Sequence, residues 1–267
     1  MKNVKTFKKM KRDNQKIVMV TAYDYPSGKY VQEACVDIIL VGDSLGMVIL
    51  GYEDTLKVTL DDILHHTKAA RRGADNTFIV ADMPFMSYNL NLEQTKINAA
   101  CLITEGGANA VKLEGGKPSR LEAIKEIVDC EIPVVAHLGL TPQSINAFGG
   151  YRVQGKKEVE FNEILTQAKE IEKAGAFMLV LEGIPEELGR TISETIAIPT
   201  IGIGAGKFTD GQVLVYHDIL GMVDFKPKFV KNYAQLNKDI PNSINKFVGE
   251  VKDGKFPKAE NIYNPIK

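Results

Sequence analysis

The sequence predicts an α/β protein, a (β/α)8 TIM barrel that forms a single catalytic domain over residues 1–267 with extra helices at its C-terminal end. Two observations carry this prediction. Short apolar runs rich in Val, Ile and Leu recur along the chain, and most of them are separated by amphipathic stretches. Such alternation is typical of a parallel sheet covered by helices. Eight runs in a chain of 267 residues favour the closed barrel, with a doubly wound open sheet as the alternative.

The apolar runs are expected to be the strands. They cover residues 17–24, 37–44, 78–84, 110–116, 132–139, 177–183, 198–206 and 211–218. The last two runs lie too close together for a full crossover helix between them, and the composition of the eighth, GQVLVYHD, also allows a helix. The connection between the last two strands is therefore left open.

The amphipathic stretches between the runs are expected to be the covering helices. They include residues 59–73, 91–107, 119–130 and 162–176. The lysine-rich start of the chain, KNVKTFKKMKR, is expected to be a solvated arm. Residues from about 226 onward are expected to add helices to the same domain.

Composition excludes several classes of function. Apolar residues make up 44% of the chain, charged residues 25%, and the formal net charge is −1. This balance gives no electrostatic reason to expect nucleic acid or an anionic membrane as a partner. No apolar run approaches membrane-spanning length, so we expect a soluble, cytoplasmic protein. Cys35, Cys101 and Cys130 have no CxxC-type spacing and are expected to be buried, reduced thiols.

Polar side chains follow most of the apolar runs. They are Asp43 and Ser44 after IILVG, Asp82 after FIVA, Glu114 after AVKL, His137 after PVVA and Glu182 after MLVL. In a parallel barrel these strand ends meet at one rim, where the active sites of this fold lie. Each residue alone is explained by a helix cap, a turn or an ion pair. Together, several carboxylates at one rim would repel one another unless a cation neutralised them, which predicts a metal site.

The residue types favour a hard metal ion. The expected ligands are oxygens, and the sequence has neither an HExxH motif nor a cysteine cluster. Mg²⁺ therefore fits best, or another divalent ion. His65 and His66 are adjacent on an expected helix and face different directions, so we interpret them as surface or packing residues.

The segment AVKLEGG suggests the substrate. Side chains alternate along a strand, so Lys112 and Glu114 point to the same face. Lys112 can neutralise the carboxylate of a 2-oxo acid whose keto oxygen is polarised by the metal, which acidifies the neighbouring C–H bond. Glu182 ends an apolar strand, where partial removal from water would make it a stronger base, and it is the candidate for accepting that proton.

Several motifs taken together resemble the ketopantoate hydroxymethyltransferase family. They are TAYDYPSG, VGDSLGMVILGYEDTLKVTLDDILHHTKAARRG, ADMPF, VKLEGG, AHLGLTPQSINAFGGYRVQG, LVLEGIP and IGIGAGKFTDGQVLVYHDILG, and they span roughly residues 3–260. The resemblance implies a (β/α)8 barrel that assembles as a homodecamer. It also implies transfer of a hydroxymethyl group from 5,10-methylenetetrahydrofolate to 3-methyl-2-oxobutanoate, giving 2-dehydropantoate on the pathway to pantothenate and coenzyme A.

The resemblance also implies roles for individual residues. The metal ligands of the family match Asp43, Asp82 and Glu114, the residues that hold the 2-oxo acid match Asp43, Ser44, Asp82 and Lys112, the general base matches Glu182, and a histidine close to the substrate matches His137. No folate-contacting residue follows from the pattern. Lys57 stands where the family has a proline in a TLPVT stretch, which affects the expected rigidity of that loop rather than the chemistry.

Three other functions are consistent with the residue pattern alone. Another metal-dependent enolising barrel, of the isocitrate lyase or phosphoenolpyruvate mutase type, would use the same ion and the same substrate class. GIGAGK, which ends the seventh run, could bind the phosphate of a phosphosugar, although a tight turn explains it as well. A non-catalytic barrel that binds a small acid is the third.

Overall fold

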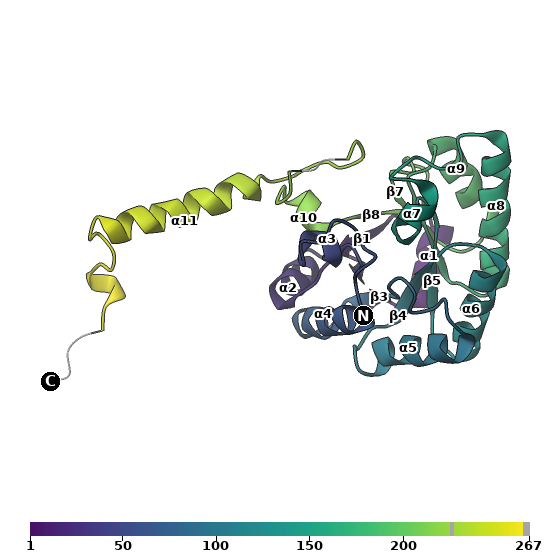
Figure 1. Cartoon of the computed structure of the whole chain (residues 1–267), viewed down its shortest axis with the longest axis horizontal. Coiled ribbons are helices and arrows are strands. Elements are labelled where there is room, and N and C mark those ends of the chain that lie inside the picture. Colours follow the sequence, from purple (N-terminus) through teal and green to yellow (C-terminus); the bar gives the residue numbers. More distant parts are fainter. Residues whose placement is uncertain (225–226, 264–267) are drawn as a thin grey trace. The chain divides into compact units, whose positions relative to one another are not determined.

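The computed structural model describes residues 1–224 and 227–263, and its contacts divide the chain into two compact units, Met1–Tyr216 and His217–Lys267. The first unit contains the strands and the helices that surround them (Figure 1). The second contains the C-terminal helix α11 (Leu236–Lys252). The expectation of one domain over residues 1–267 stays a prediction.

Parallel strands close into a barrel in the order β1 to β8, and β8 pairs back onto β1. The strands are β1 (Ile17–Thr21), β2 (Ile38–Val41), β3 (Phe78–Asp82), β4 (Ala110–Glu114), β5 (Val134–Gly139), β6 (Met178–Glu182), β7 (Thr200–Ile203) and β8 (Gly211–Leu214). Each lies within one of the runs expected from the sequence. The prediction of a (β/α)8 barrel is confirmed, and the closing β8–β1 pair excludes an open sheet.

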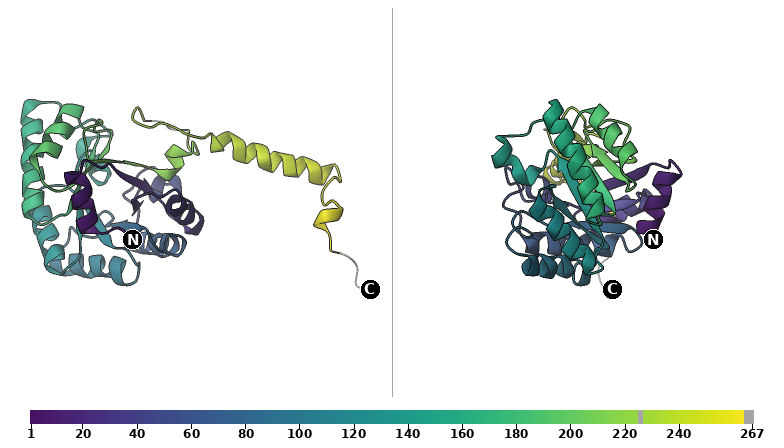
Figure 2. Two further views of the ribbon diagram at one scale, coloured as in Figure 1. Left: turned by 180° about the vertical axis from the view of Figure 1, so that it is seen from behind. Right: turned by 90° about the vertical axis from the view of Figure 1, so that its right-hand side faces the viewer.

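Helices surround the barrel strands (Figure 2). They are α2 (Tyr25–Glu33), α3 (Leu45–Val48), α4 (Leu60–Gly73), α5 (Leu92–Thr104), α6 (Pro118–Asp129), η1 (Pro142–Ser144), α7 (Ile145–Phe148), α8 (Glu158–Lys173) and α9 (Glu186–Thr195). All four helices expected from the amphipathic stretches are present. Residues 204–210, between β7 and β8, contain no helix, so this connection is not a full βα unit. A short helix, α10 (Tyr216–Ile219), follows β8.

The lysine-rich N-terminal segment is a packed helix, α1 (Val4–Arg12), so the prediction of a solvated arm was wrong. Phe7 and Met10 lie three residues apart on one face of α1, and both are buried in the core that the barrel strands form. Phe7 contacts Phe78 of β3 edge-on, with ring centroids 5.1 Å apart. The apolar spacing within the basic segment is what packs this helix against the barrel.

The three thiols are more exposed than expected. Cys35 and Cys130 are exposed and Cys101 is partly exposed, so the prediction of buried cysteines was wrong. Cys35 and Cys130 lie where α2 and α6 end, and Cys101 is in the last turn of α5, away from the apolar faces of these helices.

In residues 1–224 and 227–263, no helix is both long enough and apolar enough to cross a membrane.

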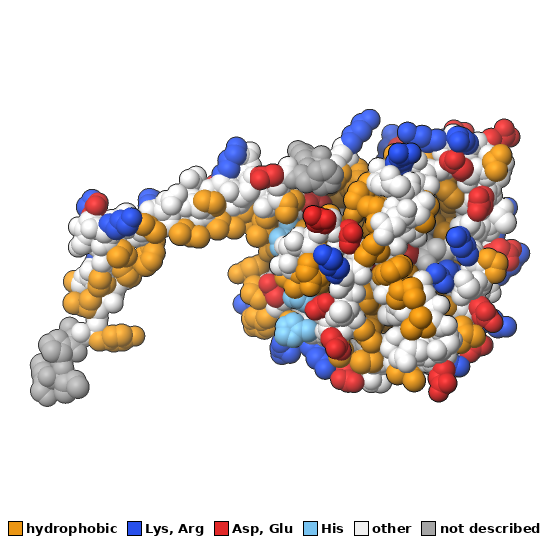
Figure 3. Space-filling model, viewed as in Figure 1, with side chains coloured by type: hydrophobic (Ala, Val, Ile, Leu, Met, Phe, Trp, Pro, Cys, Tyr) orange, Lys and Arg blue, Asp and Glu red, His pale blue; other side chains and the backbone are white. Residues whose placement is uncertain are grey.

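The second unit carries an apolar stripe on α11. Hydrophobic side chains follow one side of this helix (Figure 3), and the exposed ones are Ile240, Ile244, Phe247, Val248 and Val251. Their spacing places them on one face. A short 3₁₀ helix, η2 (Ala259–Asn261), follows.

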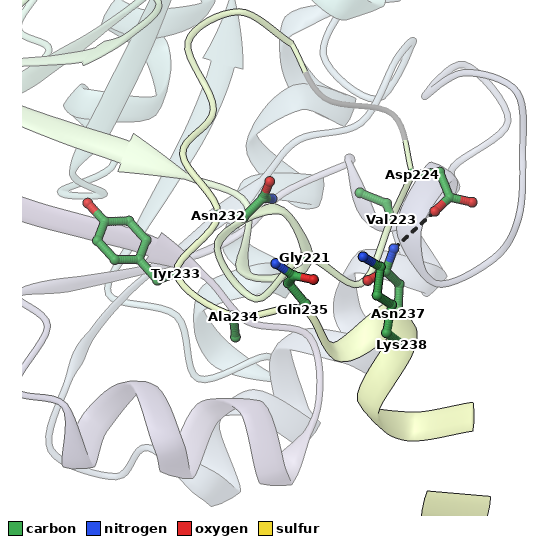
Figure 4. Close-up of a pocket in the computed structure, with 9 residues that line it drawn as sticks. All are labelled: Gly221, Val223, Asp224, Asn232, Tyr233, Ala234, Gln235, Asn237 and Lys238. Atoms are coloured by element: carbon green, nitrogen blue, oxygen red, sulfur yellow. Dashed lines mark hydrogen bonds between the residues drawn. The ribbon is translucent and has the colours of Figure 1, made fainter. Parts of the chain in front are cut away.

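An open pocket of about 400 Å³ also lies in the second unit. Asn237 donates a hydrogen bond to Asp224 across it, at 3.1 Å (Figure 4). Its lining consists of Gly221, Val223, Asp224, Asn232, Tyr233, Ala234, Gln235, Asn237 and Lys238. None of these is a site residue expected from the sequence.

Candidate active site

Strand register brings the predicted polar residues together at the C-terminal ends of the strands. Asp82 at the end of β3 pairs in register with Lys112 of β4, and Glu114 at the end of β4 pairs with His137 of β5. Glu182, at the end of β6, pairs with Gly139. Partners in register on adjacent strands direct their side chains to the same face, so this cluster follows directly from the pairing.

Lys112 is the buried cation of the cluster. Its ammonium donates a hydrogen bond of 2.6 Å to Asp82 Oδ1 and lies 3.8 Å from Glu114 Oε1. Burial alone would lower the pKa of Lys112, but the negative charges of Asp82, Glu114 and Asp43 outweigh it and raise the pKa above the ordinary value. Lys112 is therefore held as a cation although its side chain is only 5% exposed.

His137 lies between two carboxylates. Its Nδ1 is 3.2 Å from Glu114 Oε1, and its Nε2 is 3.4 Å from Glu182 Oε2. Both nitrogens are buried, and within the described chain neither contact is directed well enough to be a hydrogen bond. Burial alone would lower the pKa of His137, but Glu114 and Glu182 outweigh it and raise the pKa to about 9. The imidazole is thus protonated at neutral pH and bridges the two acids.

Of the buried carboxylates in the cluster, Asp43 is the one whose negative charge is least compensated by neighbouring cations. It follows β2, is buried, and forms no ion pair with any described residue. Its Oδ2 accepts a hydrogen bond of 2.8 Å from Gln143 Nε2, and its backbone N–H donates to Asp82 Oδ2 at 3.1 Å. Burial, followed by the neighbouring charges of Asp82 and Glu114, raises the pKa of Asp43 well above its ordinary range. A cation at this position would relieve that unfavourable charge.

The negative charge of Asp82 is unfavourable for the same reason, since burial raises the pKa of Asp82 despite the Lys112 ammonium beside it. Glu114 behaves in the opposite way. Burial alone would raise the pKa of Glu114, but His137, Lys112 and the N–H of Gln143 outweigh it and lower the pKa. Glu114 Oε1 faces His137 and Lys112, while Oε2 accepts a hydrogen bond of 3.0 Å from the Gln143 N–H. Both oxygens of Glu114 are therefore engaged within the protein.

Carboxylate oxygens are the ligands that a hard divalent ion prefers, and Asp43 and Asp82 supply them side by side. Across residues 1–224 and 227–263, no group of three or more His, Cys, Asp or Glu side chains is arranged to hold one ion. An ion held by Asp43 and Asp82 would be completed by water or substrate, a coordination common for Mg²⁺ in proteins. The expectation that Glu114 is a third ligand stays a prediction.

Three residues of the site were missed by the sequence analysis. Gln143, in η1, contacts Asp43 and Glu114, and Tyr88, between β3 and α5, donates a hydrogen bond of 2.6 Å to Gln143 Oε1. The Tyr23 hydroxyl lies 2.8 Å from Ser44 Oγ. These residues lie in loops or turns beyond the strand ends, where no periodic pattern marks them. The quoted motifs contain Tyr23 and Gln143, but no spacing links either to its partner.

The backbone at Gly139 joins the ends of β5 and β6. Gly139 has a φ of +95°, and a Cβ there would lie 2.2 Å from the carbonyl oxygen of Glu182. The next residue, Leu140, donates a backbone hydrogen bond of 2.8 Å to that oxygen. Only glycine allows this approach, which sets the distance between the strands that carry His137 and Glu182.

The other residues singled out from the sequence lie outside the cluster. His65 is exposed, and His66 Nδ1 lies 2.6 Å from the carbonyl oxygen of Tyr23, which fits the expected surface and packing roles. The Lys57 ammonium lies over the ring of Tyr52, 5.9 Å from its centroid.

The arrangement supports chemistry on a small anion. One face of the cluster offers a fixed cation, Lys112, beside Asp43 and Asp82, two buried carboxylates whose pKa values burial raises. The other offers Glu182, which keeps 17% side-chain exposure and is held by the imidazolium of His137. Together these groups can bind a carboxylate, polarise an adjacent oxygen and accept a proton.

Comparison of the chain with known proteins identifies one family. A family model described as ketopantoate hydroxymethyltransferase matches residues 1–259. A 3-methyl-2-oxobutanoate hydroxymethyltransferase of Clostridium beijerinckii is 55% identical over 265 residues, which cover 98% of this chain and 96% of the relative. One of Enterococcus faecalis is 56% identical over 257 residues, covering 96% of this chain and 93% of the relative.

Solved structures share the barrel with much less sequence similarity. The phosphoenolpyruvate phosphomutase of Streptomyces platensis subsp. rosaceus superposes with a TM-score of 0.64 at 13% identity, covering 99% of this chain and 92% of that one. At this identity the likeness extends to the fold alone.

Proposed function

Because the chain belongs to the ketopantoate hydroxymethyltransferase family, we propose that it transfers a hydroxymethyl group from 5,10-methylenetetrahydrofolate to 3-methyl-2-oxobutanoate. The product is 2-dehydropantoate, an intermediate on the route to pantothenate and coenzyme A. The observation that carries the proposal is the buried Lys112–Asp82 pair beside the carboxylate of Asp43, which forms no ion pair within residues 1–224 and 227–263. This combination suits a substrate that presents a carboxylate and a keto oxygen together.

Asp43 and Asp82 are the proposed ligands of a Mg²⁺ ion or another divalent ion. Burial raises the pKa of both carboxylates, so their ionised forms are unfavourable here and a divalent cation would compensate that charge. The sequence led us to expect Glu114 as a third ligand, but its oxygens contact His137, Lys112 and Gln143, so we place it beside the ligands, where it completes the metal site from outside. When bound, the ion supplies Lewis-acid polarisation of the keto oxygen and acidifies the adjacent C–H bond.

The substrate carboxylate is assigned to Lys112, with Ser44 and His137 completing the binding site. Lys112 stays charged throughout, so it compensates the substrate charge that burial would otherwise make unfavourable. Ser44, held by Tyr23, offers a hydroxyl next to Asp43. His137 remains a cation between Glu114 and Glu182 and contributes positive charge where the enolate oxygen develops.

Glu182 is the proposed general base. It accepts the proton from C3 of the oxo acid, and His137 holds its carboxylate in place through the 3.4 Å contact. The enolate carbon then forms a bond to the methylene carbon of the folate while one of the two C–N bonds of that carbon breaks. Water displaces the remaining folate nitrogen, which gives the hydroxymethyl product and tetrahydrofolate. The proton taken from C3 and one proton of the water are needed on the two folate nitrogens released in tetrahydrofolate, and the 17% side-chain exposure of Glu182 leaves its carboxylate accessible for that transfer.

The competing functions have less support. A phosphoenolpyruvate phosphomutase shares the fold at 13% sequence identity, whereas the hydroxymethyltransferase relatives are 55% and 56% identical to this chain. In the GIGAGK segment, the N–H of Lys207 donates to the carboxylate of Glu186 at 3.1 Å, and a negative charge at that position disfavours a phosphate. A non-catalytic binding protein would have no use for the Glu182–His137 pair.

We further propose a cytoplasmic homo-oligomer, a decamer by family resemblance, with no nucleic-acid or membrane partner. The apolar stripe on α11 supports self-association, because five exposed hydrophobic side chains on one helix face favour a protein contact. The pathway itself uses small, water-soluble metabolites, which supports the location.

An omission assay tests the function. Purified protein is incubated with Mg²⁺ and 3-methyl-2-oxobutanoate, with and without 5,10-methylenetetrahydrofolate, and 2-dehydropantoate is measured by mass spectrometry. We expect product only when the folate is present. Consumption of the oxo acid without folate would indicate a lyase or mutase instead. Calorimetric binding of the oxo acid without turnover in either mixture would support the non-catalytic alternative.

A further inference from the structure

We propose that Gln143 is a positioning residue that fixes the carboxylates of Asp43 and Glu114 relative to each other. The inference rests on the proposed function, in which Asp43 is a metal ligand and Glu114 supports the metal site from outside it. Gln143 lies in η1, directly after β5, and is itself 95% buried. It thus reaches the acids from outside the strands that carry them.

Every polar atom of Gln143 that can face the site makes a hydrogen bond. The side-chain Nε2 donates to Asp43 Oδ2 at 2.8 Å and to the carbonyl oxygen of Met83 at 3.1 Å. The backbone N–H donates to Glu114 Oε2 at 3.0 Å, and Oε1 accepts from the Tyr88 hydroxyl at 2.6 Å. One residue therefore connects the segments that follow β2 and β3 with the end of β4.

The orientation of the amide is determined by its partners. The backbone N–H of Glu114 donates to the Tyr88 oxygen at 3.2 Å, so the Tyr88 hydroxyl proton is free to point to Gln143 Oε1. With Oε1 occupied in this way, Nε2 must face the Asp43 carboxylate and the Met83 carbonyl. The carbonyl can only accept a hydrogen bond, and so can the carboxylate when it is ionised. A flipped amide would place a carbonyl oxygen against a carboxylate.

Asp43 depends on this contact more than its neighbours do. Asp82 has Lys112 and Glu114 has His137, whereas within the described residues Gln143 is the side chain that donates to Asp43. The amide thus holds Oδ2 of Asp43 and restricts the rotation of that carboxylate. A residue that orients a ligand in this way typically contributes 10- to 100-fold to metal affinity or activity.

The test compares two substitutions of similar size with a surface control. Gln143→Met removes all the side-chain hydrogen bonds, and Gln143→Glu keeps the shape but replaces the donor to Asp43 by an acceptor. Gln15→Met makes the same chemical change at an exposed position. Mn²⁺ affinity is measured by electron paramagnetic resonance titration without substrate, and kcat, KM and thermal unfolding are measured alongside.

We expect Gln143→Met to weaken Mn²⁺ binding and to lower kcat by about 10- to 100-fold, and Gln143→Glu to lower kcat at least as much, with Gln15→Met unchanged. The proposal is overturned if Gln143→Met stays within about twofold of the wild type in Mn²⁺ affinity while it folds normally. A wild type that binds Mn²⁺ but transfers no hydroxymethyl group would refute the proposed function, and the Mn²⁺ titration would still decide the role of Gln143.

Tyr88→Phe provides a gentler variant if Gln143→Met fails to fold. It removes the donor to Oε1 and the acceptor for the Glu114 N–H, and it leaves the other three bonds of Gln143 in place. We expect Tyr88→Phe by itself to weaken Mn²⁺ binding measurably. Where Gln143→Met also folds, we expect the loss in Tyr88→Phe to be the smaller one and the double variant to lose no more than Gln143→Met, since Tyr88 acts through Gln143. Wild-type affinity in Tyr88→Phe, or full additivity in the double variant, would contradict this arrangement.

Discussion

Glu114 and His137 are partners in register on adjacent strands, and Glu114 Oε1 lies 3.2 Å from His137 Nδ1. The opposite nitrogen of the same imidazole lies 3.4 Å from Glu182 Oε2. The buried imidazolium of His137 thus lies between Glu114, next to the proposed metal site, and Glu182, the proposed base.

This relationship makes stability depend on pH. Since the folded-state pKa of His137, about 9, lies above the ordinary value of 6.5, the imidazolium stabilises the fold fully below pH 6.5. That contribution is lost as the pH rises through about 9. The wild type is compared with His137→Gln by urea denaturation with EDTA present. We expect the difference between their free energies of unfolding to become smaller between pH 6.5 and 9. A difference that stays constant over this range would contradict the charged state assigned to His137.

Glu182→Gln removes the proposed base while keeping the size of the side chain. We expect exchange of the C3 proton of 3-methyl-2-oxobutanoate with D2O, followed by NMR with Mg²⁺ present, to slow by about 100- to 10,000-fold. Substrate affinity should stay close to that of the wild type. The exposed Glu187→Gln in α9 is the matched control and should exchange normally. Exchange at the wild-type rate in Glu182→Gln would remove this residue from the role of base.

Lys112→Met keeps the length of the side chain but removes its charge. Charge-assisted hydrogen bonds contribute about 1.5–3 kcal/mol, so affinity for the oxo acid should fall by about 10- to 100-fold. The sharper measurement compares 3-methyl-2-oxobutanoate with the uncharged ketone 3-methyl-2-butanone as inhibitors. The wild type should strongly prefer the acid and the variant should not. An unchanged preference would mean that the substrate carboxylate lies elsewhere.

Asp82→Ala tests the metal site without reference to turnover. Affinity for the oxo acid is measured by calorimetry in Mg²⁺ and in EDTA. We expect the wild type to bind more tightly in Mg²⁺ and the variant to bind equally weakly in both, because one of two carboxylate ligands is lost. A variant that still responds to Mg²⁺ would count against Asp82 as a ligand.

Sequence could predict the parts of the site that strand geometry controls. Asp82, Lys112, Glu114 and His137 lie on strands whose side chains alternate and whose ends meet at one rim, so their convergence follows once the barrel is recognised. Their pairing, in contrast, depends on register. Which carboxylate faces Lys112 and which faces His137 is decided by interstrand hydrogen bonds that no single segment encodes.

Residues held by loops and turns could not be predicted. Gln143 and Tyr88 lie 55 positions apart and meet through a 3₁₀ turn and an irregular segment, where neither period 2 nor period 3.6 applies. The N-terminal helix was missed for a related reason. Lysines dominate the composition of this helix. Only two of its side chains, Phe7 and Met10, are buried in the barrel core, and that core cannot be seen in the segment alone.

Gly139→Ala tests whether the backbone between β5 and β6 sets the geometry of His137 and Glu182. The new Cβ would lie 2.2 Å from the Glu182 carbonyl oxygen, so the two strand ends must separate. Gly149→Ala is a matched control, because Gly149 also has a positive φ, +67°, but a Cβ there meets no atom within 4 Å. Both variants carry the conformational cost of a positive φ, roughly 1 kcal/mol, and only Gly139→Ala adds the collision. We therefore expect Gly139→Ala to be the less stable variant in urea denaturation and to lose most of its C3 proton exchange, while Gly149→Ala keeps it. Equal stability and equal exchange in the two variants would show that the close approach at Gly139 does not position the base.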